Sequence, residues 1–345
     1  MVKIDEILLG PLGDVGEQAA AAQAQGVDGV WITELSEDPF LYATRAIEHT
    51  SNVTVGTSVA VALARSPMNV AYMSYALNRF SNGRFILGLG SQVRTQIEDR
   101  FSMPYGEPTA RMTEYVQALR ATWATWQTDV PLNFQGKFYH HTSMEPLFTP
   151  PVSPYGSPKV YMAAVNPGMV KTAAEVADGM IPMLTPPRYL REVLMPIIEK
   201  GLAASGRERS DFEICLMSGF FTGFFVTETE EDLKAALNTQ RKRAPYYFSV
   251  PNYASMLELY GYKDLQPALH EVRYSDLPET EKWERMANMI PDGLLLEVGT
   301  YAPAAELPAK LKERFGGLVD RFLLGGGNPF IAPPAELRAS IGETG

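Results

Sequence analysis

The amino-acid sequence predicts an α/β fold of the (β/α)8 TIM-barrel type. Short apolar runs alternate with longer segments of helical periodicity, and eight such strand–helix pairs fit into the 345 residues. The alternatives are two domains of average size or a doubly wound sheet, which usually has a glycine-rich first turn. The first turn here reads GPLG, at residues 10–13, and is not G-x-G-x-x-G. We therefore favour one barrel.

The first half of the chain supplies four strand–helix pairs. Short apolar or β-branched runs predict strands at residues 4–9, 29–33, 53–62 and 84–89. Segments with helical spacing predict helices at residues 14–25, 41–50, 68–81 and 108–127. The first of these helices is rich in alanine and begins with Asp14 at its N-cap.

The second half repeats the pattern. Strands are expected at residues 159–164 and 180–184, within residues 212–226, and at residues 319–324. Helices are expected at residues 168–177 and 188–205, from 230 to 239, and near 334–340. We expect residues 1–341 to form a single domain and residues 342–345 to be a flexible tail.

Two insertions interrupt the alternation. Residues 133–142 (NFQGKFYHHT) predict a hairpin around Gln135-Gly136. Residues 244–289 form a long, aromatic-rich insertion, expected to be helical, before the last strand. Insertions of this size in a compact domain usually carry function.

Composition excludes several functional classes. A net charge of −10 argues against nucleic acid and anionic membranes as general partners. Cys215 is the single cysteine, so it is expected to be buried, with no intrachain disulfide and no thiolate zinc cage. The sequence shows no leader and no apolar run of about 18 residues, so we expect a cytoplasmic protein that does not cross a membrane.

Familiar catalytic motifs are missing. The four histidines are His49, His140, His141 and His270; none ends a predicted strand, and no H-x-H or H-E-x-x-H occurs. We therefore expect no metal site. The sequence also has no G-x-S-x-G elbow and no Walker phosphate loop.

In a barrel, catalytic side chains follow the carboxyl ends of the strands. The second strand is followed by Glu34, Glu37 and Asp38, which are either acid–base groups or caps of the next helix. Arg65, after the third strand, either binds an anion or caps a loop. Gly88 and Gly90, in and after the fourth strand, allow a ligand or a neighbouring backbone to come close.

Candidate ligand contacts follow the remaining strands. Gln92 is a donor to a ligand carbonyl, and Met183 with residues 184–187 could wall a ring pocket. Four phenylalanines after the seventh strand either line an apolar cavity or belong to a core strand. They are Phe220, Phe221, Phe224 and Phe225.

The fifth strand leads into KVYMAAVNPGMVKTAAEVADGMI, residues 159–181, in which Asn166-Pro167-Gly168 is a turn. Pro167 has no N–H, so the donors are those of Asn166, Gly168 and Met169. With the helix dipole they suit an anion, although an ordinary βα turn is the alternative. An apolar mouth, an anion site and few acid–base groups suit a redox cofactor.

Six blocks together resemble the luciferase-like monooxygenase superfamily, and most closely its coenzyme F420-dependent (deazaflavin) branch. They are GVDGVWITE, VGTSVAVALARSPMNVA, GRFILGLGSQ, RFSMPYGEPTARMTEYVQALRATW, NFQGKFY and AAVNPGMVKTAAEVADG. The likeness covers residues 27–322, and the order and spacing of the blocks are more specific than any one of them.

The resemblance implies a barrel, usually dimeric, with a deazaflavin across its mouth and the cofactor phosphate on the turn after the fifth strand. It implies a cis peptide between Ser58 and Val59 behind the central ring, and small residues, Ala163 and Ala164, beneath the cofactor. The implied cofactor contacts are Ser58, Val59, Ala60, Ser91, Ala163, Ala164, Val165, Asn166, Pro167, Gly168, Met169 and Met183.

One position departs from the family pattern. Sugar-phosphate and alcohol dehydrogenases of this group carry an Asp-His pair where this chain has Glu34 and Leu35. The missing histidine argues against a sugar phosphate as substrate and against alcohol oxidation by a histidine base. As catalytic residues we expect Glu34, exchanging a proton, and Gln92, orienting a carbonyl.

Three functions are compatible with these features. The first is a homodimeric F420-dependent oxidoreductase that transfers hydride between the deazaflavin C5 and an apolar, aromatic or unsaturated small molecule. The second is an FMN-dependent monooxygenase that uses O2, and the third is a ligand-binding barrel without catalysis. Because FMN lacks a long anionic tail, a track of cations near the phosphate, from Lys171, Arg65 or Arg188, would favour the deazaflavin.

Overall fold

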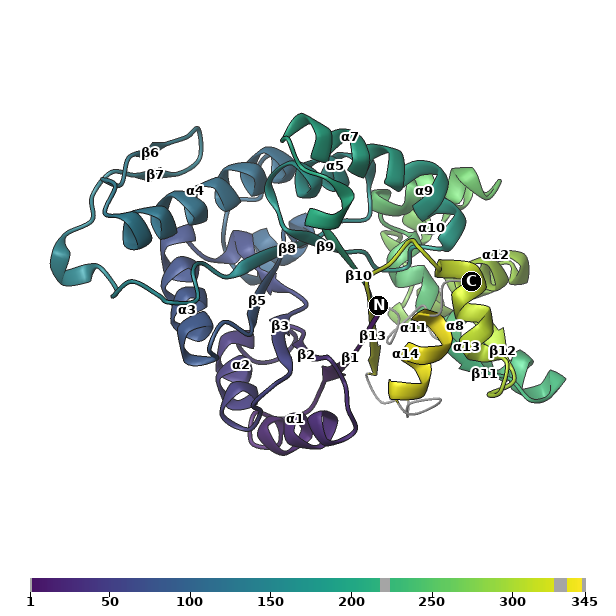
Figure 1. The fold of residues 1–345 in the computed structure, drawn as a ribbon. Coiled ribbons are helices and arrows are strands. Elements are labelled where there is room, and N and C mark those ends of the chain that lie inside the picture. Colours follow the sequence, from purple (N-terminus) through teal and green to yellow (C-terminus); the bar gives the residue numbers. More distant parts are fainter. Residues whose placement is uncertain (1, 218–223, 326–333, 343–345) are drawn as a thin grey trace.

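A computed structural model of the chain describes residues 2–217, 224–325 and 334–342. Parallel strands close into an eight-stranded barrel, because the sheet runs β3-β2-β1-β13-β10-β9-β8-β5 and β3 also pairs with β5. Helices surround this barrel (Figure 1). The strands are β1 (Lys3–Leu8), β2 (Gly29–Ile32), β3 (Thr54–Thr57), β5 (Phe85–Gly90), β8 (Lys159–Ala163), β9 (Gly179–Ile181), β10 (Glu213–Met217) and β13 (Arg321–Gly325). The predicted (β/α)8 fold is confirmed.

The third barrel strand is interrupted, although the sequence predicted one strand over residues 53–62. The peptide between Ser58 and Val59 is cis, as the resemblance implied, and the strand resumes as β4 (Ala60–Val61). Gly56 pairs with Ile86 and Ala60 with Leu89. The third strand therefore advances four residues while β5 advances three, which is a bulge of one residue at the mouth end.

Side-chain caps start several helices. Asp38 accepts a hydrogen bond from the N–H of Phe40, Ser66 from Asn69, and proline follows each of these caps. Asp14 occupies the expected N-cap, but its side chain makes no capping hydrogen bond. The helices on the barrel are α1 (Val15–Ala24), α2 (Pro39–Glu48), α3 (Pro67–Phe80), α4 (Pro108–Thr128), α5 (Pro167–Val176), α6 (Pro187–Tyr189), α7 (Met195–Ala204), α13 (Leu307–Phe315) and α14 (Pro334–Gly342).

The seventh barrel strand lies within residues 212–226, as predicted, and occupies the first part of that segment. β10 ends at Met217, and β11 (Phe224–Val226) pairs instead with β12 (Thr300–Ala302) in a separate two-stranded sheet. Phe224 packs against Phe322, which belongs to the core between strands and helices. Phe220 and Phe221 lie outside the described residues.

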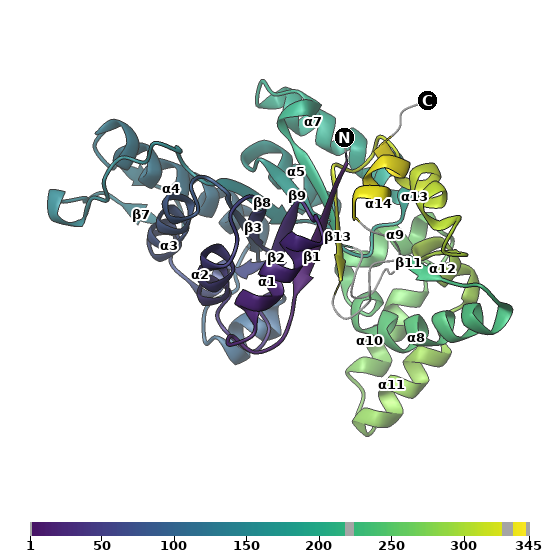
Figure 2. The same ribbon diagram turned by 60° about the horizontal axis from the view of Figure 1, so that its bottom comes forward.

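Both insertions adopt the expected kind of structure. The hairpin consists of β6 (Phe134–Gln135) and β7 (His140–His141), and it extends away from the barrel in Figure 1. The second insertion is helical, and Figure 2 shows its helices grouped on one side of the barrel. Its helices and their neighbours are α8 (Glu230–Phe248), α9 (Ala254–Leu259), α10 (Leu265–Arg273), α11 (Glu279–Asn288) and α12 (Asp292–Val298). The predicted helix 230–239 thus continues into the insertion.

Two apolar cores are separated by the sheet. The larger one lies between strands and helices, and the smaller one fills the barrel interior. Gly56 makes room for the indole of Trp31, since a Cβ there would come within 2.5 Å of the ring. Cys215 is buried, as expected. The interior cluster is formed by Ile7, Trp31, Ile86, Tyr161, Ile181, Cys215, Met217 and Leu323.

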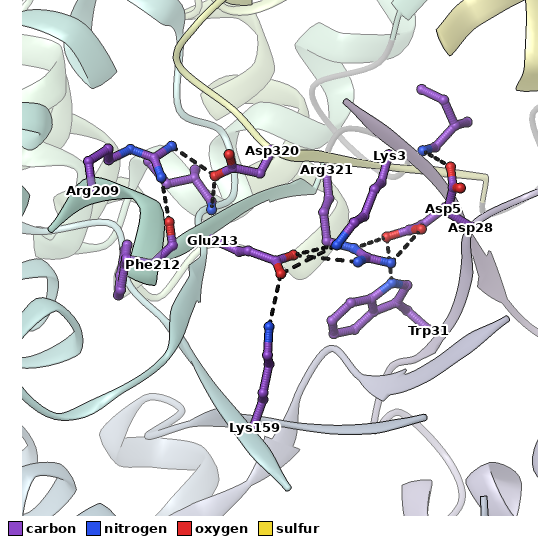
Figure 3. A network of polar contacts seen from close by, with 12 residues as sticks. Lys3, Asp5, Asp28, Trp31, Lys159, Arg209, Phe212, Glu213, Asp320 and Arg321 are labelled. Atoms are coloured by element: carbon purple, nitrogen blue, oxygen red, sulfur yellow. Dashed lines mark hydrogen bonds and ion pairs between the residues drawn. The ribbon is translucent and has the colours of Figure 1, made fainter. Parts of the chain in front are cut away.

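Charged residues close the N-terminal end of the barrel (Figure 3). The guanidinium of Arg321 donates to Asp5 at 2.6 and 2.9 Å, and Trp31 Nε1 donates to the same carboxylate at 2.9 Å. Glu213 accepts hydrogen bonds from Lys3 and Lys159. Burial opposes the charge of Glu213, but the hydroxyl of Tyr161 and the surrounding cations outweigh burial and lower the pKa of Glu213 to about 2. Residues at this end of a barrel usually serve stability.

Residues 2–217, 224–325 and 334–342 contain neither a membrane-spanning helix nor a cluster of metal-binding side chains. Among their helices, none combines the length and apolar character needed to cross a membrane. No three His, Cys, Asp or Glu side chains of the same residues gather in a way that could hold a metal ion. Of the tail expected at 342–345, Gly342 ends α14, and residues 343–345 lie outside the description.

Candidate active site

Small and apolar residues form the floor of the barrel mouth. Val59, at the cis peptide, packs on the interior cluster together with Leu9 and Met183. A Cβ on Gly90 would come within 2.5 Å of the Val59 side chain and 3.5 Å of Ala163. The floor therefore offers an apolar surface at the carboxyl ends of the strands, where barrel active sites lie.

The structure decides between the two explanations for Gly88. A Cβ there would lie 1.8 Å from the carbonyl oxygen of Thr57, so a neighbouring backbone occupies this space. The Thr57 hydroxyl also donates to the Gly88 carbonyl at 2.7 Å and accepts from the Gly88 N–H at 2.9 Å. This side chain joins the third strand to β5 directly before the bulge.

Glu34 follows β2 and is held by three hydrogen bonds. The N–H of Val61 donates to its carboxylate at 2.8 Å, and the two guanidinium nitrogens of Arg65 donate at 2.8 and 3.0 Å. Arg65 also pairs with Asp38 at 2.8 Å. Burial opposes the charge of Arg65, but its hydrogen bonds to Glu34 and Asp38 outweigh burial and raise its pKa. Glu34 thus anchors the strand beyond the bulge.

The segment after β5 crosses the rim toward β2. Gln92 is exposed, has a φ of 59°, and its carbonyl accepts hydrogen bonds from the hydroxyls of Ser91 and Tyr105, each at 3.3 Å. Further along, Arg100 donates to the carbonyl of Leu35 at 2.8 Å. Leu35 itself is 51% exposed, so an apolar side chain stands where the resemblance has a histidine.

The turn after β8 keeps fewer free donors than the sequence suggested. The side chain of Asn166 caps α5 by accepting from the N–H of Met169 at 2.9 Å, so that donor is taken. Pro167 has no N–H. Among the described residues the N–H groups of Asn166 and Gly168 have no acceptor, and they lie at the positive end of the α5 dipole, where Gly168 is exposed to solvent. Two donors at a helix N-terminus suit a phosphate oxygen.

The three cations proposed as a track beside the phosphate each face a carboxylate. Arg65 binds Glu34, Lys171 lies 3.7 Å from Glu175, and Arg188 lies 3.1 Å from Glu192. The last two pairs are exposed, so solvent screens them and a stronger anion could compete for either cation.

Several predicted contact residues turn their side chains away from the mouth. Ala60, Ala164 and Met169 belong to the core between strands and helices, so only their backbones remain for a ligand. Ser58 is buried, and its hydroxyl lies 3.4 Å from that of Thr33. The side chains that the structure brings together on the floor are Val59, Ala163 and Met183.

Sequence reasoning missed Tyr189. Its hydroxyl lies 3.3 Å from the carbonyl oxygen of Val165, the residue before the Asn166 cap. A tyrosine inside a helical pattern gives no signal of such a contact, because the partner is a backbone atom 24 residues earlier in the chain.

A separate hollow of about 530 Å³ lies at the opposite end of the barrel. It is bordered by the C-terminal end of α2 and the turn before β5, and its lining includes His49, Phe80 and Arg84. These are loops that precede strands, so the hollow belongs to the N-terminal face and not to the mouth.

The chain matches the family model for luciferase-like monooxygenases over residues 5–321. It belongs to the luciferase-like monooxygenase family. The uncharacterized protein Rv1360 of Mycobacterium tuberculosis (strain ATCC 25618 / H37Rv) is 44% identical over 324 residues, which are 93% of this chain and 92% of that protein.

The names of two further proteins that are similar to this luciferase-like chain include coenzyme F420. The putative coenzyme F420-dependent oxidoreductase Rv3520c of the same M. tuberculosis strain is 30% identical over 58% of this chain and 59% of that protein. The structure of coenzyme F420-dependent tetrahydromethanopterin reductase from Methanopyrus kandleri superposes with a TM-score of 0.75. That match has 19% identity and covers 98% of this chain and 97% of the other, so it supports the barrel fold.

The luciferase-like mouth fits a flavin-type cofactor on two observations. The bulge places Val59 over the interior cluster as a floor for a planar ring, and the α5 terminus leaves two N–H groups for a phosphate. Both features lie at the carboxyl ends of the barrel strands.

Proposed function

We propose that this protein is a coenzyme F420-dependent oxidoreductase that acts on an apolar, aromatic or unsaturated small molecule. The observation that carries the proposal is the α5 terminus, where the N–H groups of Asn166 and Gly168 have no acceptor among the described residues and lie beside an apolar floor. The named relative Rv3520c supports the choice of deazaflavin. When bound, this cofactor supplies hydride transfer at its C5 atom.

The residues of the chain bind and shield the reactants. The backbone N–H groups of Asn166 and Gly168 hold the phosphate, and Val59, Ala163 and Met183 form the surface under the ring. Leu35 is exposed at the rim, which favours an apolar substrate over a sugar phosphate. Excluding water from such a mouth strengthens the polar contacts inside it.

Glu34 and Gln92 are the proposed catalytic residues. Glu34 would exchange a proton with the substrate, which requires Arg65 to release one of its two hydrogen bonds to the carboxylate. The amide of Gln92 is exposed at the rim, where rotation of its side chain would bring it to a substrate carbonyl.

FMN is the second candidate cofactor. It is favoured by the pairing of Arg65, Lys171 and Arg188 with carboxylates, since a long anionic tail would have to compete with those partners. An FMN enzyme of this fold would be a monooxygenase that uses O2. A barrel that binds a ligand without catalysis is the third candidate.

The proposal includes a homodimer. Leu147, Phe148 and Val152, after the β6–β7 hairpin, are 86, 57 and 63% exposed. Between residues 130 and 155 only Lys137 and Glu145 carry a full charge, in a chain with a net charge of −10. A neutral apolar surface lets two copies of an acidic chain meet without strong repulsion.

The first experiment is a fluorescence titration of the protein with coenzyme F420 and, in parallel, with FMN. Micromolar or tighter binding of F420 with weak FMN binding supports the proposal. Tight FMN and weak F420 binding would move the protein to the monooxygenases, and binding of neither would leave the third candidate.

A matched pair of variants at Gly168 ties this binding to the α5 terminus. A Cβ at Gly168 meets only the Asn166 side chain, at 3.5 Å, so a side chain is accommodated. Gly168→Asp places a carboxylate beside the phosphate and should weaken F420 binding at least about tenfold. Gly168→Ala should change it less than about threefold. Equal affinity of the two variants would show that the phosphate binds elsewhere.

A further inference from the structure

Tyr189 lies directly behind the phosphate-binding turn. It ends α6, and its ring is buried. Its hydroxyl oxygen lies 3.3 Å from the carbonyl oxygen of Val165 and 2.7 Å from Oγ of Ser255. Val165 precedes the cap of α5, whereas Ser255 belongs to α9 in the helical insertion. One side chain therefore joins the turn to the insertion.

The number of protons on each group determines which one donates in the two hydrogen bonds of Tyr189. A phenol has one proton, and a carbonyl oxygen only accepts, so the proton of Tyr189 is donated to Val165. The Ser255 hydroxyl must then donate to the oxygen of Tyr189. The chain of hydrogen bonds runs from Ser255 through Tyr189 to the carbonyl of Val165.

The carbonyl of Val165 and the N–H of Asn166 belong to one peptide unit. In a planar trans peptide these two groups point in opposite directions, so fixing the carbonyl also fixes the N–H. A hydrogen bond to the carbonyl further polarises the N–H through the peptide. The N–H held in this way is one of the two donors that the α5 terminus leaves free.

We propose that Tyr189 and Ser255 are positioning residues for the phosphate-binding turn, and that the helical insertion acts on the cofactor site through Ser255. A second contact joins the same elements, because Arg188 of α6 lies over the ring of Tyr260, directly after α9, at 5.7 Å from the ring centre. This inference rests on the proposed function, in that the turn binds a cofactor phosphate.

The first test compares Tyr189→Phe and Ser255→Ala with wild type by F420 titration. Tyr189→Phe should raise the Kd about three- to tenfold, the usual effect of losing one positioning hydrogen bond. Ser255→Ala should raise it by a smaller factor. The double variant should match Tyr189→Phe alone, because Ser255 acts only through Tyr189. Additive losses would overturn the relay.

The control is Tyr115→Phe. The Tyr115 hydroxyl is buried on α4 and, within the described part of the chain, has no hydrogen-bond partner. Removing it should leave the Kd unchanged. If Tyr189→Phe lowers the melting temperature but leaves the Kd at the wild-type value, Tyr189 has a structural role only and the inference is wrong.

A second readout does not need a flavin. Titration with inorganic phosphate is followed through the NMR amide signals of Asn166 and Gly168. Both signals should shift in wild type, and Tyr189→Phe should move the Asn166 midpoint to higher phosphate concentration. This result without flavin binding would refute the proposed function and keep the inference. Flavin binding with unresponsive amides would refute the inference alone.

Discussion

At the scale of single residues, the carboxylate of Glu34 makes two kinds of contact. The carboxylate accepts a hydrogen bond from the Val61 N–H beyond the bulge, and it neutralises the partly buried guanidinium of Arg65. Three hydrogen-bond donors already occupy its two oxygens. Proton transfer by Glu34 therefore requires Arg65 to release a hydrogen bond to this carboxylate. Asp38 then remains as a second acceptor for the guanidinium of Arg65.

Glu34→Gln tests the catalytic role. The amide keeps the size of the side chain and can still accept from Val61, but it cannot carry a proton to the substrate. With reduced coenzyme F420 and a panel of cyclic enones, we expect kcat to fall at least about a hundredfold for any enone that wild type reduces. The Kd for the coenzyme should stay near the wild-type value.

Asp38→Asn is the matched control for that variant. It removes a second negative charge beside Arg65, but its amide oxygen can still accept a hydrogen bond from Arg65 or from the Phe40 N–H, so it should retain most of the turnover. Full turnover by Glu34→Gln would rule out proton transfer at this residue and leave it the anchoring role alone.

At the scale of elements, Glu213 links four barrel strands. It lies on β10 and pairs with Lys3 on β1, Lys159 on β8 and Arg321 on β13. Because its pKa is lowered from 4.5 to about 2, its contribution to stability is present above about pH 4.5 and is lost as the pH falls toward 2.

We expect Glu213→Gln to lower the free energy of unfolding at pH 7 by about 2 kcal/mol, allowing for partial contact with solvent. The difference between variant and wild type should shrink as the pH falls from about 4.5 to 2. Denaturant unfolding at several pH values measures both. Glu199→Gln, on the exposed side of α7, is the control, and a constant difference over this range would contradict the assignment.

Most of the strands and helices of the barrel could be predicted from the sequence. The alternation of strands and helices was enough for the barrel, because hydrophobic periodicity reflects which side of each element is buried. The seventh strand was predicted within residues 212–226 but without its ends, because residues 213–217 and 224–226 are both apolar runs. Periodicity does not reveal that the second run pairs with β12, about 75 residues later.

The candidate site was predictable to a similar degree. The turn at residues 166–168 and the cis peptide at Ser58 and Val59 were both located from the sequence, the latter through the resemblance. Side-chain direction was less accessible: Ala163 faces the mouth, but Ala164 enters the outer core because neighbouring strand residues alternate. The contact of Tyr189 with Ser255 depends on how the insertion folds back, which no local pattern records.

At the scale of the whole molecule, the exposed apolar residues after the hairpin form the surface of the proposed homodimer. Leu147→Asp combined with Val152→Asp places two like charges on that surface in each copy. We expect wild type to have twice the chain mass of 38.1 kDa in light scattering, and the variant to have the mass of one chain.

Tyr274→Asp is the control for the dimer. Tyr274 is also exposed but lies at the end of α10, away from the hairpin, so that variant should remain dimeric. A monomeric wild type, or a dimeric double variant, would show that this surface is not a dimer interface.

The charged closure of the barrel at its N-terminal end also bears on how such a protein can change over evolutionary time. The ion pairs of Arg321 with Asp5 and Glu213 join the strands at the N-terminal end of the barrel. The residues that would contact a substrate lie on loops at the other end. Substitutions that alter those loops leave the closure in place. A lineage can therefore sample new substrates at the mouth without first finding another way to hold its barrel together.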